Sequence, residues 1–178
     1  AAFPLEAEQF FRHGYPVDVA VGRRVPQKGF DTLIRAVALA NQTTSLGLVI
    51  VGDGPLRDEP LELATREGIA DRVHLAGFQP HPAAFARRAN MLVLSSRYEG
   101  FGTVLVEALA CGVPVVSTDC DFGPSEILQA GRLGRLVSVD DVVALAEAML
   151  STLSEKPDRD ALRQRAENFA PARIARAY

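Results

Sequence analysis

Two glutamates flank a glycine-containing turn: Glu99 precedes it, and Glu107 lies eight residues later. Gly100 and Gly102 let the backbone of this turn approach a ligand closely, and successive N–H groups can donate to a phosphate. Carboxylates accept hydrogen bonds from hydroxyl groups, including those of a sugar. Backbone N–H groups that donate to a phosphate, with a carboxylate acceptor at each end, suit a nucleoside diphosphate sugar. The donating backbone would be that of Phe101, Gly102, Thr103 and Val104.

Glu107 is the more informative glutamate because its neighbours, residues 104–106 and 108–110, are all apolar. We therefore expect its carboxylate to lie in a low-dielectric setting, where an unpaired charge is very costly. Its donors would be Arg or Lys side chains, backbone N–H groups or sugar hydroxyls. A structural salt bridge stays open as the alternative.

A second candidate segment, residues 22–29, places cations and glycines between an expected strand and an expected helix. Backbone N–H groups at a helix entrance, together with the positive end of the helix dipole, favour an anion. Arg23 carries a guanidinium fork that can grip a phosphate, while Lys28 acts as a point charge. A solvated basic turn is the alternative interpretation.

Both segments belong to a chain in which strand and helix patterns alternate. Short apolar runs bounded by Gly, Pro or Asp predict strands buried on both faces, as in parallel sheets covered by helices. The predicted strands span residues 17–21, 48–51, 73–75, 91–94, 113–117 and 136–139. The predicted helices are one capped by Asp31 or Thr32, followed by 61–67, 82–89, 103–110, 125–129, 141–153 and 158–168.

This alternation predicts an α/β fold: an open, doubly wound, Rossmann-like parallel sheet of about six strands with helices on both faces. Ligands of such sheets bind outside the carboxyl ends of the strands, where both candidate segments fall. We divide the chain into an inter-domain linker, or its remnant, at residues 1–16, a ligand-binding domain at 17–156 and a C-terminal helical segment at 157–178.

Composition narrows the class of protein. The chain has 178 residues, of which 48% are hydrophobic and 23% charged, values that indicate one globular domain and exclude disorder or a fibrous repeat. A net charge of −3 argues against a nucleic-acid partner, whose binding surface should be basic. The two cysteines, Cys111 and Cys120, form neither a zinc site nor a disulfide framework, and favour a reducing compartment.

The sequence carries no recognisable targeting segment. Residues 1–9 lack the basic and apolar regions of a signal peptide, and the most apolar stretch, residues 104–116, is too short to span a bilayer. We therefore expect a cytoplasmic protein, with peripheral association at the inner face of the membrane left open. Because the first residue is Ala rather than Met, the chain is expected to be processed or truncated.

Five segments, in order, resemble the donor domain of one enzyme family. This is the C-terminal domain of retaining glycosyltransferases with the GT-B fold, family 4, also called group 1. The segments are VGRRVPQKGFDTL at 21–33, VIVGDGP at 49–55, VHLAGF at 73–78, SSRYEGFG at 95–102 and EALACGVPVV at 107–116. Glu99 and Glu107 then form that family's E-x7-E signature. The resemblance covers residues 17–150, which is most of the chain.

The resemblance implies a role for each candidate residue. Arg23 and Lys28 would bind the diphosphate and stabilise it as it leaves. Glu99 would orient the donor sugar, and Glu107 would accept from the ribose hydroxyls. The other implied substrate contacts are Gly22, Phe78 facing the base, Gly100, Phe101, Gly102, Thr103 and Val104 at the phosphates, and Glu126 at the sugar pocket.

The resemblance also implies a metal-independent reaction, with the nucleotide sugar as co-substrate and no other cofactor. Asp119 and Asp121 imitate the D-x-D metal motif of another glycosyltransferase fold. Two carboxylates are a weak motif, and the surrounding loops resemble those of a metal-independent family. We interpret the likeness as accidental.

The implied reaction is transfer of a hexose from a UDP-sugar to an acceptor hydroxyl with retention, in cell-surface polysaccharide or glycolipid synthesis. An N-terminal half, absent from this chain, would bind the acceptor, so the chain alone is expected to be inactive. Two alternatives stay open: a nucleotide-binding regulatory module and a GT-B-type sugar epimerase. An epimerase needs acid and base side chains, but His13, His74 and His81 lie outside the candidate loops.

Overall fold

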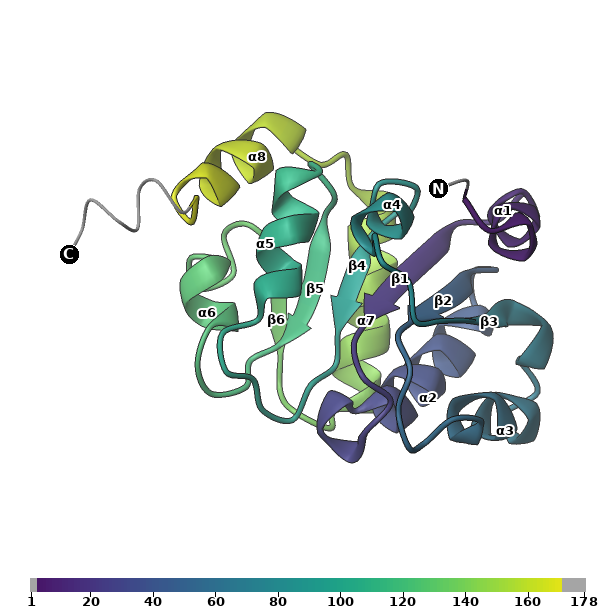
Figure 1. Cartoon of the computed structure of the whole chain (residues 1–178). Coiled ribbons are helices and arrows are strands. Elements are labelled where there is room, and N and C mark those ends of the chain that lie inside the picture. Colours follow the sequence, from purple (N-terminus) through teal and green to yellow (C-terminus); the bar gives the residue numbers. More distant parts are fainter. Residues whose placement is uncertain (1–2, 171–178) are drawn as a thin grey trace.

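A computed structural model describes residues 3–170 and shows one six-stranded sheet (Figure 1). Its strands are β1 (Val17–Val21), β2 (Gly47–Val51), β3 (Val73–Gly77), β4 (Leu92–Leu94), β5 (Val115–Thr118) and β6 (Arg135–Val137). They lie in the order β3-β2-β1-β4-β5-β6, and every neighbouring pair is parallel. This is the open, doubly wound sheet that the alternating pattern predicts.

Helices cover both faces of the sheet (Figure 1). They are α1 (Leu5–Phe11), α2 (Phe30–Asn41), α3 (Glu59–Arg66), α4 (Ala83–Ala86), α5 (Thr103–Ala110), α6 (Pro124–Ile127), α7 (Val142–Ser154) and α8 (Arg159–Glu167). Helices α2, α3 and α7 share one buried cluster with the sheet. Helices α5, α6 and α8 share a second cluster, and α1 and α4 contribute to a third. The predicted fold class is therefore confirmed.

The start of α2 differs from the expectation. Asp31 or Thr32 was expected to cap this helix, but the N-cap is Gly29, with φ 61° and no side-chain cap. A Cβ at Gly29 would lie 2.1 Å from the carbonyl oxygen of Ser95, so only glycine allows the approach of the two loops. The Asp31 carboxylate binds Arg97 instead.

Helix α1 was not predicted from the sequence, and α4 is shorter than predicted. Helix α1 forms inside the segment expected as a linker, and it buries Ala7 and Phe10 against the sheet. Helix α4 ends at Ala86 rather than at residue 89. The backbone and side chain of Asn90 both bond to Val17, which draws the chain out of the helix and toward β4.

The C-terminal helical segment contains α8 as expected, and Leu162 and Ala166 pack in the cluster beneath α5. Its last residues, 171–178, lie outside the described part of the chain. The domain division at residues 16 and 156 stays a prediction. Among the helices of residues 3–170, none is long and apolar enough to cross a membrane.

Asp18 is an ionisable group in the centre of the sheet. It lies in β1, fully buried, and neither carboxylate oxygen has a hydrogen-bond partner. Because side chains alternate along a strand, Asp18 faces the same side as Ala20, toward the cluster of α2, α3 and α7. Burial raises the pKa of Asp18 well above its usual range. The folded chain therefore favours the protonated acid.

Replacing Asp18 by Asn should make stability less dependent on pH. The folded chain holds this proton more tightly than the unfolded chain, so the contribution of Asp18 to wild-type stability falls as pH rises above about 4, the pKa of an unfolded Asp. The fall is at most about 1.4 kcal/mol per pH unit and ends above the raised folded pKa. Urea unfolding should show Asp18→Asn gaining on wild type between pH 5 and pH 8.

The exposed Asp121 provides the control, because Asp121→Asn should change little at any of these pH values. A difference between Asp18→Asn and wild type that stays constant with pH would contradict this account of Asp18.

Candidate functional site

The two candidate loops lie at the carboxyl edge of the sheet, at the point where the strand order reverses. Strand β1 pairs with β2 on one side and with β4 on the other, so the loops after β1 and β4 border the crevice where ligands of open α/β sheets bind. Several hydrogen bonds join these loops, and three of them end on backbone carbonyls at similar distances. Ser95 Oγ donates to the Lys28 carbonyl (2.8 Å), Arg97 N to the Gln27 carbonyl (2.8 Å) and Gln27 Nε2 to the Tyr98 carbonyl (2.8 Å).

Lys28 and Glu99 form an ion pair between these two loops. Lys28 Nζ lies 2.5 Å from Glu99 Oε1, and Ser96 Oγ donates to the same oxygen at 2.5 Å. The side chains of Lys28 and Glu99 are only 17% and 9% exposed. The structure thus brings together two residues that are 71 positions apart. A positive and a negative group of the predicted site therefore face one another at the switch point.

Arg23 lies apart from this pair. It is exposed and lines a shallow hollow of about 460 Å³ together with Asp53, Gly54, Pro55 and Arg57. Neither Lys28 nor Glu99 lines that hollow. Gly22 stands at the end of β1, where a Cβ on Gly52 would lie 1.9 Å from its carbonyl oxygen. Arg23 is thus placed on the loop as predicted, with its side chain toward solvent.

The neighbouring Arg24 is the buried arginine of this loop, and sequence reasoning gave it no role. It is 7% exposed, donates to Asp53 Oδ1 at 2.8 Å and also bonds to the Arg57 carbonyl. The Gly54 N–H, followed by the charges of Arg57 and Arg24, lowers the pKa of Asp53. Arg24 therefore ties the loop after β1 to the loop after β2. Because the two arginines are adjacent, the sequence does not indicate which of their side chains turns inward.

The turn before α5 is the segment that we predict to offer backbone donors to a phosphate. Gly102 is the N-cap of α5, with φ 86°, and no side chain caps the helix. The Leu105 N–H donates to the Gly102 carbonyl at 2.9 Å, whereas the N–H groups of Thr103 and Val104 precede this first intrahelical bond and can meet an anion. Gly100, Phe101 and Thr103 are exposed. A Cβ on Gly123 would lie 1.7 Å from the Phe101 carbonyl oxygen, so the loop after β5 packs directly beneath this turn.

The expectation of a low-dielectric setting for Glu107 is wrong. Helix α5 buries Leu105, Ala108 and Leu109, whereas Glu107 lies on the exposed face. Apolar neighbours in sequence do not bury a residue when several of them are partly exposed themselves. In the described part of the chain, no hydrogen bond or ion pair reaches the Glu107 carboxylate, so the structural salt bridge finds no support there either.

Two outlying site residues are also exposed. Phe78 follows β3 at the same edge of the sheet and is 77% exposed. Glu126 lies in α6 with its side chain in solvent, while its carbonyl accepts from Arg165 Nη2 at 2.6 Å. Both stay predicted contacts. Among residues 3–170, no group of three or more His, Cys, Asp or Glu could hold a metal ion, and Asp119 and Asp121 form no such group.

A hydrogen-bond network centred on Arg97 connects the loops of the candidate site. Arg97 donates to both Asp31 oxygens (3.0 and 2.9 Å), to Asp140 Oδ2 (3.1 Å) and to the Pro26 carbonyl (2.5 Å). Burial alone would raise the pKa of Asp31, but the hydrogen bonds and charge of Arg97 outweigh it and lower that pKa. Thr32 also donates to Asp140. The network joins the loops after β1, β4 and β6, and no local pattern signals it.

Removing this guanidinium should loosen the site. Arg97→Gln loses several charge-assisted bonds at a partly exposed position, and we expect it to lower the unfolding free energy by about 1–2 kcal/mol. Arg35→Gln is the matched control, because Arg35 reaches the same Asp31 only at 3.5 Å on the surface, and its loss should cost less than about 0.5 kcal/mol. Urea unfolding compares the two; equal losses would contradict the assignment.

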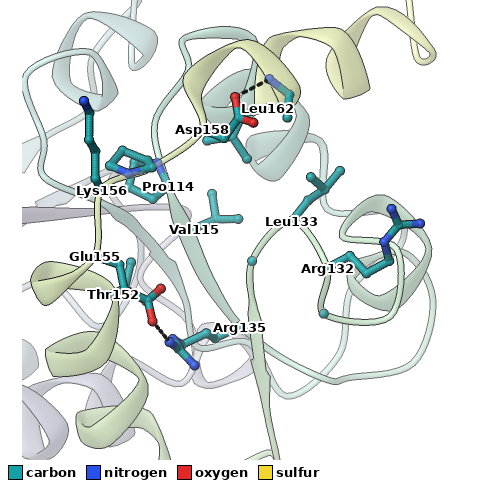
Figure 2. Close-up of a pocket in the computed structure, with 14 residues that line it drawn as sticks. Pro114, Val115, Arg132, Leu133, Arg135, Thr152, Glu155, Lys156, Asp158 and Leu162 are labelled. Atoms are coloured by element: carbon teal, nitrogen blue, oxygen red, sulfur yellow. Dashed lines mark hydrogen bonds and ion pairs between the residues drawn. The ribbon is translucent and has the colours of Figure 1, made fainter.

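A separate cavity of about 290 Å³ lies at the opposite edge of the sheet (Figure 2). Its lining includes Val115 and Arg135, the first residues of β5 and β6, and the link between α7 and α8. Arg135 pairs there with Glu155 (Figure 2). Because all strands are parallel, this cavity is at the amino ends of the strands and does not belong to the candidate site.

Comparison with known proteins links this geometry to a family. The sequence model described as "Glycosyl transferases group 1" matches residues 4–169. The chain is 35% identical over 161 residues to the lipopolysaccharide core biosynthesis glycosyltransferase LpsE of Rhizobium meliloti (strain 1021). That match covers 90% of this chain and 46% of LpsE.

Solved structures give the same result. The apo form of the lipopolysaccharide outer core galactosyltransferase WaaB superposes with a TM-score of 0.82 at 27% identity, over 93% of this chain and 48% of WaaB. Anabaena Alr3699/HepE, in complex with UDP and glucose, superposes with a TM-score of 0.79 at 25% identity, over 94% of this chain and 47% of HepE. The chain thus spans less than half the length of these three proteins.

Proposed function

The chain belongs to the group 1 glycosyl transferases, and on that premise we propose that it is the C-terminal, donor-binding half of a retaining glycosyltransferase of family 4. The whole protein would transfer a hexose from a UDP-hexose to an acceptor hydroxyl. The name of LpsE supports a role in cell-surface polysaccharide or glycolipid synthesis, and the UDP and glucose bound to HepE support the choice of donor.

The observation that carries the proposal is the meeting of Lys28 and Glu99 at the switch point of the sheet. In the proposed complex, Lys28 and Arg23 contact the diphosphate, and the unpaired N–H groups at the start of α5 hold its oxygens. Glu99 accepts from the donor sugar and the exposed Glu107 from the ribose. The cations and backbone donors then face the diphosphate, and the two carboxylates face the hydroxyl groups on either side of it. This order of protein groups matches the order of chemical groups along a nucleoside diphosphate sugar.

The proposed chemistry needs no protein nucleophile. The bond between the anomeric carbon and the diphosphate oxygen breaks, and the leaving oxygen takes the electron pair. The acceptor oxygen bonds to the anomeric carbon on the same face of the sugar, and its proton passes to the leaving diphosphate. Charge then builds on the diphosphate, where preorganised donors lower the barrier; one such donor is typically worth about 10²-fold or more in rate.

The reaction is proposed to be metal-independent, with the chain's own cations opposing the diphosphate charge. Donor affinity should therefore be the same in EDTA as without it. The acceptor would be held by a second domain outside this chain, so that the chain alone binds donor without transferring sugar. A cytoplasmic location, peripheral to the membrane through that second domain, is part of the same proposal.

The epimerase alternative needs acid and base side chains, and two of the histidines that could supply them lie away from the candidate loops. The His74 ring stacks on Phe10 with centroids 5.6 Å apart, and burial lowers its pKa. His13, just after α1, bonds to the carbonyl of Gln9 in that helix. Neither lies on the loops after β1 or β4. A regulatory module would bind nucleotide without contributing to transfer, and an inactive Lys28→Met form of the whole protein would argue against it.

Loss of the Lys28 charge should weaken nucleotide binding. We expect Lys28→Met to reduce the affinity for UDP by about tenfold or more, because a charge-assisted contact to phosphate is worth roughly 1.5–3 kcal/mol. Isothermal titration calorimetry of the chain with UDP measures this. Lys156→Met, at the opposite edge of the sheet, is the matched control and should bind UDP as wild type does. Wild-type affinity in Lys28→Met would count against the site.

Glu107→Ala separates a binding role from a structural one. Because Glu107 is exposed and without a protein partner in the described chain, the unfolding free energy should change by less than about 0.5 kcal/mol. UDP affinity should fall by about tenfold through loss of a charged acceptor for the ribose. Glu147→Ala, an exposed glutamate within α7, serves as control. A large stability loss with unchanged affinity would restore the salt-bridge interpretation.

A further inference from the structure

Glu99 is held by a hydroxyl that the family signature does not include. Ser96 is fully buried, and its Oγ donates to Glu99 Oε1 at 2.5 Å. Among residues 3–170, the Ser96 hydroxyl makes no other hydrogen bond. Lys28 Nζ binds the same Oε1 at 2.5 Å. Two donors therefore converge on one oxygen of the carboxylate.

The second carboxylate oxygen is left available. None of the described residues donates to Glu99 Oε2, and solvent still reaches this atom. A carboxylate oxygen keeps its acceptor capacity when the other oxygen is engaged. The rotamer that places Oε1 on Ser96 therefore also sets the direction in which Oε2 is offered.

The backbone of Ser96 is itself held by a hydrogen bond. Its carbonyl accepts from Thr118 Oγ1 at 2.6 Å, and Thr118 is fully buried in β5. The adjacent Ser95 binds the Lys28 carbonyl through its Oγ. A fixed backbone with a single side-chain partner makes the Ser96 hydroxyl a rigid donor, whereas the Lys28 ammonium ends a flexible four-carbon stem.

We propose that Ser96 is a positioning residue that keeps Glu99 oriented while Lys28 engages the diphosphate, so that Oε2 accepts from a hydroxyl of the transferred sugar. The inference rests on the proposed function. A diphosphate competes with Glu99 for the Lys28 ammonium, because both are anions in reach of one flexible cation. It does not compete for the Ser96 hydroxyl, which lies buried beneath the carboxylate. Ser96 thus retains Oε1 when the ion pair is weakened.

The first test compares the donor with its nucleotide. Calorimetry would measure the Kd of UDP and of the tightest binder among UDP-glucose, UDP-galactose and UDP-N-acetylglucosamine. Ser96→Ala should raise the ratio of the UDP-sugar Kd to the UDP Kd by about tenfold, the weight of one hydrogen bond to a charged group. Ser96→Thr, which retains the hydroxyl, should restore much of the wild-type ratio.

Ser117→Ala is the matched control. Ser117 is also a fully buried serine at this edge of the sheet, but its hydroxyl bonds to the Thr118 carbonyl rather than to Glu99. It should leave the ratio unchanged even if it lowers stability. An equal loss of UDP and UDP-sugar affinity in Ser96→Ala, or the same change of ratio in Ser117→Ala, would overturn the role of Ser96.

A second measurement tests the contact without any ligand. A double-mutant cycle of Ser96→Ala with Glu99→Leu, which removes the acceptor, should show coupling of about tenfold in the unfolding equilibrium constant, and additive effects would overturn the inference. If wild type binds neither UDP nor a UDP-sugar, the proposed function itself fails and the sugar role of Ser96 with it. If wild type binds both and Ser96→Ala leaves their ratio unchanged, only the Ser96 inference fails.

Discussion

The candidate site depends on the ion pair between Lys28 and Glu99, which bridges the loops after β1 and β4. Both side chains are largely withdrawn from water, and removing one partner of such a pair leaves a poorly compensated charge behind. Each residue therefore holds the other in place. Because β1 pairs in parallel with both β2 and β4, these loops follow the two strands at which the sheet order reverses, and the ion pair lies between them.

Close backbone contacts hold the loops around the candidate site together. Gly29, Gly52 and Gly123 each approach the carbonyl oxygen of a neighbouring loop so closely that a Cβ would overlap it. The hydrogen bonds of Arg97 and Arg24 then lock the loops after β1, β2, β4 and β6 together. Ligand-binding groups held on such fixed loops need little reordering when the ligand arrives, which favours affinity.

Charged residues at this edge fall into two classes with different expected roles. Lys28, Glu99, Arg24 and Arg97 are engaged with protein partners and shape the site. Arg23 and Glu107 extend into solvent, so a ligand meets them without first breaking a protein contact. The proposed contacts with the sugar nucleotide therefore combine side chains that protein partners already orient with side chains that extend into solvent. Ser96 keeps Glu99 in its orientation when Lys28 binds the ligand.

The sequence by itself determined the fold class, most strands and helices, and the two loops that carry the site, because alternation of buried and amphipathic segments and the glycine-rich turns are local properties. Only the tertiary structure decided that α1 packs on the sheet, that Arg24 rather than Arg23 turns inward, and that Glu107 is exposed. It also decided the partners of Arg97 and Ser96. The burial and the partners of a side chain depend on which segments pack together, and some of these segments lie 66 to 108 residues apart along the chain. Local periodicity does not indicate which distant segments come into contact.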